Sequence, residues 1–170
     1  MTVAVETGLW RLDAVRSTIG IEHKTMWGLV TVKGAFSGVA GEGEVQADGT
    51  AHGAVTVDAG SLDTKNAKRD AHLRGADFFD VERHPTLVFA VRDAVVRPDG
   101  SVGIEGQLTV RGVDRPQSVT GTVTESSADA VTLTAEFTVD REQFNLGWNQ
   151  LGMIRGLTAV RATLRFTRSV

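Results

Sequence analysis

The residues that could do chemistry gather in one short stretch, residues 69–74. His72 could act as a general base that Asp70 orients, or the two residues could be ligands of a metal ion. A metal ion bound by His72 together with His84 or His23 is a further possibility. No His-x-His, His-Glu-x-x-His or Gly-x-Ser-x-Gly motif completes either kind of site, and the chain contains no cysteine. We therefore predict that the protein is not an enzyme, with an enzyme or metal-binding protein that uses Asp70 and His72 as an alternative.

The same charged residues can instead hold a structural element in place. Asn66 is a suitable N-cap, residues 67–74 contain good helix formers, and Gly75 is a natural terminator, which together predict a short helix. In this interpretation Arg69 and Asp70 form hydrogen bonds that fix the helix to neighbouring loops. In a third interpretation, Arg69, His72 or Arg74 contacts the polar head of a bound ligand.

The apolar residues of this stretch predict a lid. Leu73 is the only large apolar residue of the helix, and Phe78 and Phe79 follow it closely. We expect the helix and loop insertion, about residues 64–80, to close one end of an apolar interior. We predict that Leu73, Phe78, Phe79 and Trp148 form the lid or mouth, although Trp148 could equally be ordinary core cover. Arg69 and His72 are the candidates for the polar end.

The rest of the chain, which must position this lid, has a residue pattern typical of β-strands. Apolar and polar residues alternate in about eight or nine short runs joined mostly by short loops, which predicts antiparallel pairing. Most runs have one apolar face, and about eight strands can bury that face by closing into a barrel, which is filled by side chains or holds one small ligand. We predict an all-β, closed antiparallel barrel of about eight strands, in a single domain over residues 1–170.

Three glycines bear on the barrel interior. Gly34, Gly106 and Gly121 fall on the apolar faces of their strands, where they either leave room inside or mark bulges and bends that close the sheet. Together they favour a barrel with a cavity. We expect His23 to face solvent or to lie at the rim. The predicted pocket wall consists of Val32, Phe36, Phe89, Leu108, Phe137 and Leu164.

Composition excludes several classes of partner. The net charge of −3 argues against nucleic acid, and no apolar run approaches the ~20 residues of a membrane helix, so no integral membrane association is expected. The N-terminus lacks a basic region followed by a long apolar run, so we expect a cytoplasmic protein. A homodimer or interaction module, formed through a strand edge or the loop around Trp27, is a further alternative.

Several stretches resemble the YceI-like family. They are Leu9-Trp10-Arg11-Leu12-Asp13 with Ser17, Val32-Lys33-Gly34-Ala35-Phe36, Ser61-Leu62-Asp63-Thr64-Lys65-Asn66, Arg69-Asp70-Ala71-His72-Leu73-Arg74, Asp77-Phe78-Phe79-Asp80, His84-Pro85 leading into Leu87-Val88-Phe89, the run from Gly106 to Pro116, and Arg141-Glu142-Gln143-Phe144-Asn145-Leu146. The resemblance implies a lipocalin-like barrel with an elongated apolar pocket. It also implies a long-chain amphiphile as ligand, such as a polyisoprenoid, an isoprenoid quinone or a fatty-acid derivative, which the protein would bind and carry or store without a cofactor. Many members are exported to the periplasm, whereas this chain shows no signal sequence. The resemblance carries over no catalytic residue.

Overall fold

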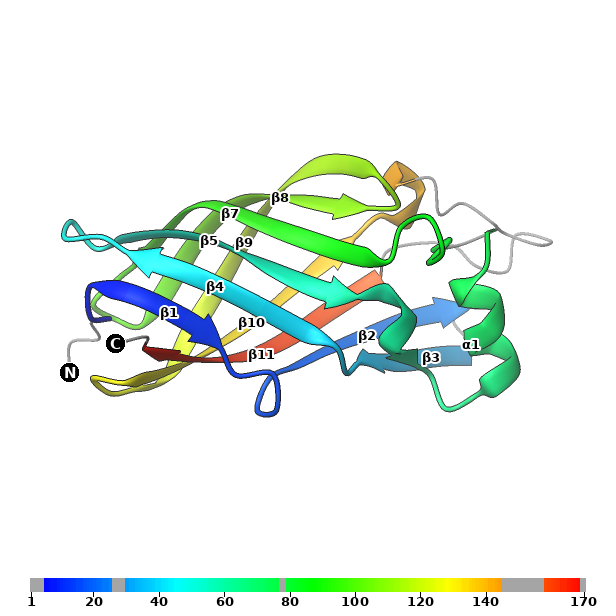
Figure 1. Ribbon diagram of the computed structural model, residues 1–170, viewed down its shortest axis with the longest axis horizontal. Coiled ribbons are helices and arrows are strands. Elements are labelled where there is room, and N and C mark those ends of the chain that lie inside the picture. The colour runs from blue at the N-terminus through cyan, green and yellow to red at the C-terminus, as the bar shows by residue number, and fades with distance from the viewer. Residues whose placement is uncertain (1–4, 26–29, 77–78, 145–157, 169–170) are drawn as a thin grey trace.

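The computed structural model describes residues 5–25, 30–76, 79–144 and 158–168, with side chains left out at 24–30, 141 and 142 (Figure 1). The elements are β1 (Gly8–Leu12), β2 (Thr18–Thr25), β3 (Val30–Phe36), β4 (Val39–Val45), β5 (Thr50–Asp58), the 3-10 turn η2 (Ala59–Ser61), β6 (Leu62–Asp63), α1 (Ala67–Arg74), β7 (Thr86–Val96), β8 (Ser101–Val110), β9 (Val113–Ser126), β10 (Ala130–Val139), the 3-10 turn η3 (Arg141–Phe144) and β11 (Thr158–Arg168).

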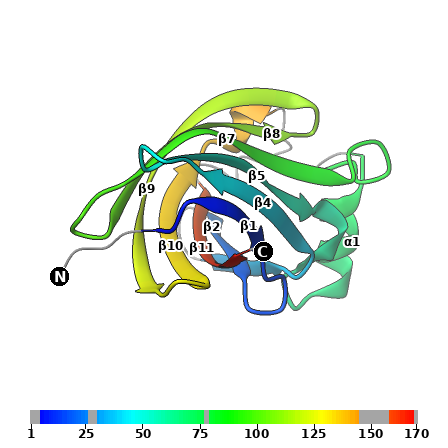
Figure 2. The ribbon, with the colours of Figure 1, turned by 60° about the vertical axis from the view of Figure 1, so that its left-hand side comes forward.

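The strand segments combine into eight strands around a closed barrel. Both β1 and β2 pair with β11, β4 pairs with β1 while β3 pairs with β2, and β5 pairs with β4 while β6 pairs with β3. Segments that follow each other along the chain, namely β1 and β2, β3 and β4, and β5 and β6, therefore each form one long strand with a break in the middle. The ring then continues through β7, β8, β9 and β10 to β11, every neighbour antiparallel. Figure 2, turned so that the end bearing β1 comes forward, shows the ring. The predicted closed antiparallel barrel of about eight strands is confirmed.

Two of the strand breaks are fastened to each other. The Ser61 hydroxyl accepts a hydrogen bond from the Gly38 N–H at 3.0 Å and donates one to the Asp58 carbonyl at 2.7 Å. The Asp58 N–H in turn donates to the Gly38 carbonyl at 2.7 Å. These bonds satisfy backbone groups that the interrupted ladder leaves without a strand partner.

The helix forms as predicted. The Asn66 side chain accepts a hydrogen bond from the Arg69 N–H at 3.0 Å, so it caps α1, and the Gly75 N–H donates to the His72 carbonyl at 3.1 Å where the helix ends. Gly75 has a φ of −74°, so its backbone does not need the conformational freedom of glycine. No helix among the described residues is long and apolar enough to cross a membrane.

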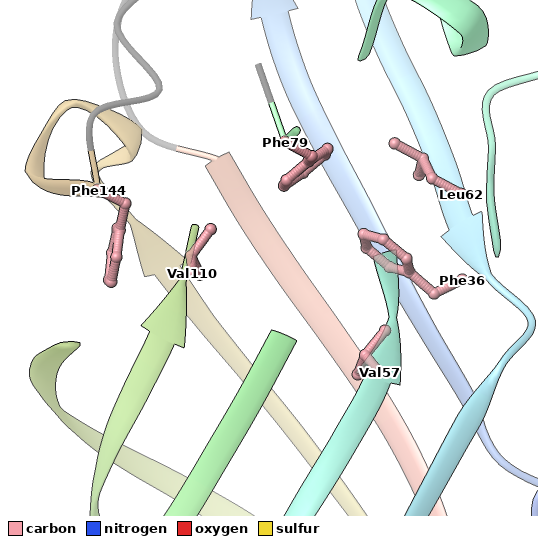
Figure 3. Close-up of a cluster of buried hydrophobic side chains, with 6 residues drawn as sticks. All are labelled: Phe36, Val57, Leu62, Phe79, Val110 and Phe144. Atoms are coloured by element: carbon pink, nitrogen blue, oxygen red, sulfur yellow. The ribbon is translucent and has the colours of Figure 1, made fainter. Parts of the chain in front are cut away.

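The buried hydrophobic side chains of the described residues form four clusters, two of them at the ends of the barrel. At the β1 end, Trp10, Val45 and Val131 pack across the interior. At the α1 end a second cluster packs around the base of the lid (Figure 3). Its buried members are Phe36, Val57, Leu62, Phe79, Val110 and Phe144.

The three inward glycines do not enlarge the interior in the way the sequence suggests. A Cβ on Gly106 would lie 2.4 Å from the Ala90 carbonyl oxygen and 2.7 Å from the Phe89 ring, and one on Gly34 would lie 2.9 Å from the Thr64 methyl. One on Gly121 would lie 3.0 Å from a Leu133 methyl. None of the three glycines lines the cavity described below. Neighbouring groups already occupy the space they leave, and Gly106 faces the bulge at Val91–Asp93 in β7.

Candidate functional site

The barrel encloses a cavity of about 670 Å³. Side chains from β2, β3, β5, β7, β8, β9, β10 and β11 form its wall, together with residues of α1 and the loops beside it. Most of the lining is aliphatic or aromatic. The polar lining residues are His23, Thr64, Asn66, Lys68, Arg69, His72 and Thr158.

The two ends of the cavity differ. Trp10, Val45 and Val131 pack across the β1 end and do not line the cavity. At the other end, Lys68 and His72 line the cavity and are also exposed to solvent, as is the helix cap Asn66. Every other described lining residue is buried or half-buried. The solvent-facing end of the cavity therefore lies at α1.

The structure brings ten of the sequence-predicted site residues together around this cavity. They are Val32, Phe36, Arg69, His72, Leu73, Phe79, Phe89, Leu108, Phe137 and Leu164. The remaining two, Phe78 and Trp148, lie outside the described residues, as does Trp27. That these side chains contact a ligand stays a prediction.

Sequence reasoning missed several lining residues. The expectation that His23 faces solvent is wrong: it is buried on β2 and lines the cavity, and its Nδ1 lies 3.0 Å from the Thr158 hydroxyl of β11. The paired residues Ala135 and Ala162 also line the cavity, where their small side chains widen the middle of the barrel. The spacing of His23 two residues after Ile21 was the available signal, because residues i and i+2 of a strand share a face.

A buried hydrogen-bond network fastens the lid to the loop before it. The Asp70 carboxylate, 5% exposed, accepts hydrogen bonds from the N–H of Thr64 at 3.0 Å and from its hydroxyl. Arg69 donates from Nε to the Thr64 hydroxyl at 2.9 Å and from Nη2 to the Thr64 carbonyl at 2.7 Å. Thr64 is itself 3% exposed, so these bonds replace water that it cannot reach. They support the interpretation in which Arg69 and Asp70 anchor the lid.

The far end of the helix is fastened in the same manner. Arg74 donates from Nε to the Gly60 carbonyl at 3.1 Å and from Nη2 to the Leu62 carbonyl at 3.0 Å. Arg111, from the β8–β9 turn, donates to the Ala76 carbonyl at 2.8 Å. Arginine suits this role because its planar fork reaches two acceptors at once. The helix is thus held from both sides.

The inner side of the lid is apolar. Phe79 is 8% exposed and meets Phe36 of β3 edge to face, with ring centroids 6.2 Å apart and planes at 74°. Leu73 packs against the same cluster from α1. The Phe36 and Phe79 rings lie near each other in this part of the barrel (Figure 3).

The arrangement does not assemble an acid–base pair from Asp70 and His72. Asp70 directs its carboxylate to Thr64 and does not line the cavity, whereas His72 does. Helical residues two apart point in different directions, so the two side chains do not face each other. Within the described parts of the chain, no three His, Asp or Glu side chains lie close enough together to hold a metal ion.

Solved structures of other proteins have the same architecture. Two solved structures share the fold at low sequence identity. BcnA of Burkholderia cenocepacia has a TM-score of 0.80 at 18% identity, over 91% of this chain and 98% of that one. A polyisoprenoid binding domain from Saccharophagus degradans, implicated in plant cell wall breakdown, has a TM-score of 0.78 at 16% identity, over 96% of this chain and all of that one.

Curated relatives match parts of the sequence. A UPF0312 protein of Vibrio cholerae is 34% identical over 87 residues, which is 50% of this chain and 46% of the relative. A UPF0312 protein of Ectopseudomonas mendocina is 40% identical over 62 residues, 36% of this chain and 32% of the relative. The matches thus span about a third to a half of these relatives. The YceI-like domain matches residues 10–167, nearly the whole chain, and the protein belongs to the YceI-like family.

Proposed function

We propose that the protein binds one long-chain amphiphilic lipid, such as a polyisoprenoid or an isoprenoid quinone, inside the barrel and carries or stores it. The observation that supports this most directly is the apolar cavity of about 670 Å³ that the protein's own side chains leave unfilled. Its volume lies within the ~300–1,000 Å³ typical of small-molecule sites. A fold neighbour from Saccharophagus degradans, described as a polyisoprenoid binding domain, points to the same class of ligand.

The shape of the cavity favours a chain over a compact ligand. Alternate residues of β11 line it from Thr158 to Phe166, eight residues along one strand. At ~3.3 Å per residue and a tilt of about 40°, that stretch covers roughly 20 Å along the barrel axis. Dividing the volume by this length gives a mean cross-section of about 33 Å², so the cavity is elongated along the barrel axis. Carbon atoms in contact are about 3.5–4.0 Å apart, so this tube-shaped cavity admits a hydrocarbon chain with methyl branches.

The energetics agree with a ligand of this size. Liquid water occupies about 30 Å³ per molecule and a methylene group a similar volume, so the cavity takes about 20 carbon atoms. Burying them is worth roughly 16 kcal/mol at about 0.8 kcal/mol per methylene. Association and ordering of a flexible chain cost about 4–15 kcal/mol, which leaves a net affinity in the range that proteins achieve.

A cavity-blocking variant tests the proposal. Ala135→Trp places a large side chain in the middle of the tube, whereas Thr138→Trp adds the same group to the outer face of the same strand. Losing contact with even two methylenes costs about 1.6 kcal/mol, so Ala135→Trp should weaken binding by more than about tenfold. The Thr138→Trp control should bind like the unaltered protein.

The measurement has two parts. Native mass spectrometry of the purified protein should show a hydrophobic adduct that organic extraction removes. Titration of the extracted protein with a 20-carbon isoprenoid, followed by displacement of a fluorescent lipid, then gives affinities for the variants. Binding that Ala135→Trp leaves unchanged, or no binding by the unaltered protein, would refute a ligand in the barrel.

A further inference from the structure

We infer that the α1 end of the cavity selects an anionic headgroup, so that the ligand is a single-chain amphiphile of about 20 carbons ending in a carboxylate or phosphate. This rests on the proposed function and adds to it the chemistry of the head, the number of chains and their length. The tail lies in the tube and the head lies beside the first turns of α1, at Lys68 and Arg69.

The charges around the cavity have one sign. Lys68 and Arg69 line it, and among the described residues no aspartate or glutamate does, although the whole chain carries a net charge of −3. The nearest acids along the chain are engaged elsewhere: Asp70 accepts hydrogen bonds from Thr64, and Asp63 lies 3.3 Å from the Lys65 ammonium. A head placed at this end therefore meets cations and no opposing carboxylate in the described lining.

Lys68 and Arg69 lie where they can bind an anionic headgroup. Lys68 is exposed while it lines the cavity, so a bound carboxylate or phosphate would keep part of its hydration and avoid the large cost of burying a charge. Arg69 is half-buried, and its bonds to Thr64 use Nε and Nη2. That fixes the guanidinium in position before a ligand arrives, which lowers the cost of ordering it on binding.

The dimensions restrict the tail. With room for about 20 carbons, the cavity accommodates one chain of that length and leaves no room for a second chain of the same length beside it. Longer chains would have to leave the cavity past α1. Affinity should therefore rise with chain length up to about 20 carbons and then level off.

Matched ligands separate the head from the tail. Geranylgeranoic acid and geranylgeraniol share the same 20-carbon isoprenoid tail and differ in a carboxylate against a neutral hydroxyl. Geranylgeranyl monophosphate tests the other anion. We expect both anionic ligands to bind more tightly than the alcohol at low salt and to lose this advantage in 0.5 M salt, because exposed charges are screened. Straight-chain fatty acids of increasing length test the limit on the tail.

Matched variants then assign the effect to residues. Lys68→Gln should weaken the acid by about two- to fivefold, the range of an exposed ion pair, and leave the alcohol unchanged. Lys65→Gln, which removes a cation of the loop just before α1 that does not line the cavity, should change neither affinity.

Each outcome decides between the claims. Equal affinity for acid and alcohol, or equal loss of both in Lys68→Gln, overturns the anionic head while the lipid-binding function stands. Affinity that keeps rising well beyond 20 carbons overturns the limit on the tail. If none of these ligands binds, the proposed function itself fails.

Discussion

Replacing Asp70 with alanine is expected to release the lid and to destabilise the barrel by about 2–4 kcal/mol. The Asp70 carboxylate accepts from both the N–H and the hydroxyl of Thr64, and both residues are almost fully buried. A buried donor left without its acceptor costs about 1–3 kcal/mol. Two such donors would cost about 2–6 kcal/mol, and the upper part of this range is reduced to about 4 kcal/mol because the Thr64 hydroxyl can rotate toward another acceptor. Asp70→Asn keeps one acceptor oxygen and should fall between alanine and the unaltered protein.

The assay is equilibrium unfolding in urea, followed by hydrogen exchange at the Thr64 amide. Asp63→Ala serves as the matched control, because Asp63 also accepts from a loop N–H, that of Lys65, but is exposed. Its loss should cost less than about 1 kcal/mol, since water replaces the bond. The reasoning is refuted if Asp70→Ala costs under about 0.5 kcal/mol while exchange at Thr64 stays slow.

Two further predictions concern the lid and the turns. Phe79→Ala should lower the free energy of unfolding in urea by about 3–5 kcal/mol, because it empties a buried site and removes the edge contact with Phe36. Phe79→Leu should lower it clearly less, and equal losses in the two variants would contradict this reasoning. The pKa values of Asp48, Asp63 and Asp99 are lowered, chiefly by hydrogen bonds from the Thr50 side chain, the Lys65 N–H and the Ser101 side chain, respectively. A carboxyl whose pKa is lower in the folded state contributes stability above its unfolded pKa near 4 and loses it as the pH falls through the folded pKa. The melting temperature should therefore drop between pH 5 and pH 3, and the drop should be smaller in the double variant Asp48→Asn/Asp99→Asn; an unchanged drop would show that other groups control the acid response.

Local signals made the helix and the strand pattern predictable. Asn66 caps α1 through its own side chain, and the helix spans the predicted residues 67–74. Alternation of apolar and polar residues correctly placed Leu108 on the inner face of its strand, where it lines the cavity, because side chains in a strand have a strict period of two. The barrel followed from the number of such runs.

The other features of the fold and of the site depend on contacts between segments that are distant in the sequence, which local patterns do not reveal. Nothing local to Gly106 says that the Phe89 ring of the neighbouring strand fills the space above it, because that depends on register and on the bulge in β7. The sequence limited Asp70 to two roles, anchoring the lid or taking part in chemistry. Its partner Thr64 could be identified only from the conformation of the loop before α1. The breaks within the long strands left no clear pattern in the sequence, because each break depends on how its two halves pair with neighbouring strands. For example, β1 and β2 pair with different stretches of β11.

The unfilled interior also gives the molecule a volumetric property. A cavity of 670 Å³ per molecule corresponds to about 400 mL per mole, and unfolding of proteins typically shrinks the system by about 20–100 mL per mole, so even a part of the cavity that water does not enter adds noticeably to this change. Since pressure favours the state of smaller volume, a barrel with an empty interior should unfold at unusually low pressure, and one filled by a lipid should resist it. Hydrostatic pressure can thus report the occupancy of the barrel without any label on the protein or the ligand.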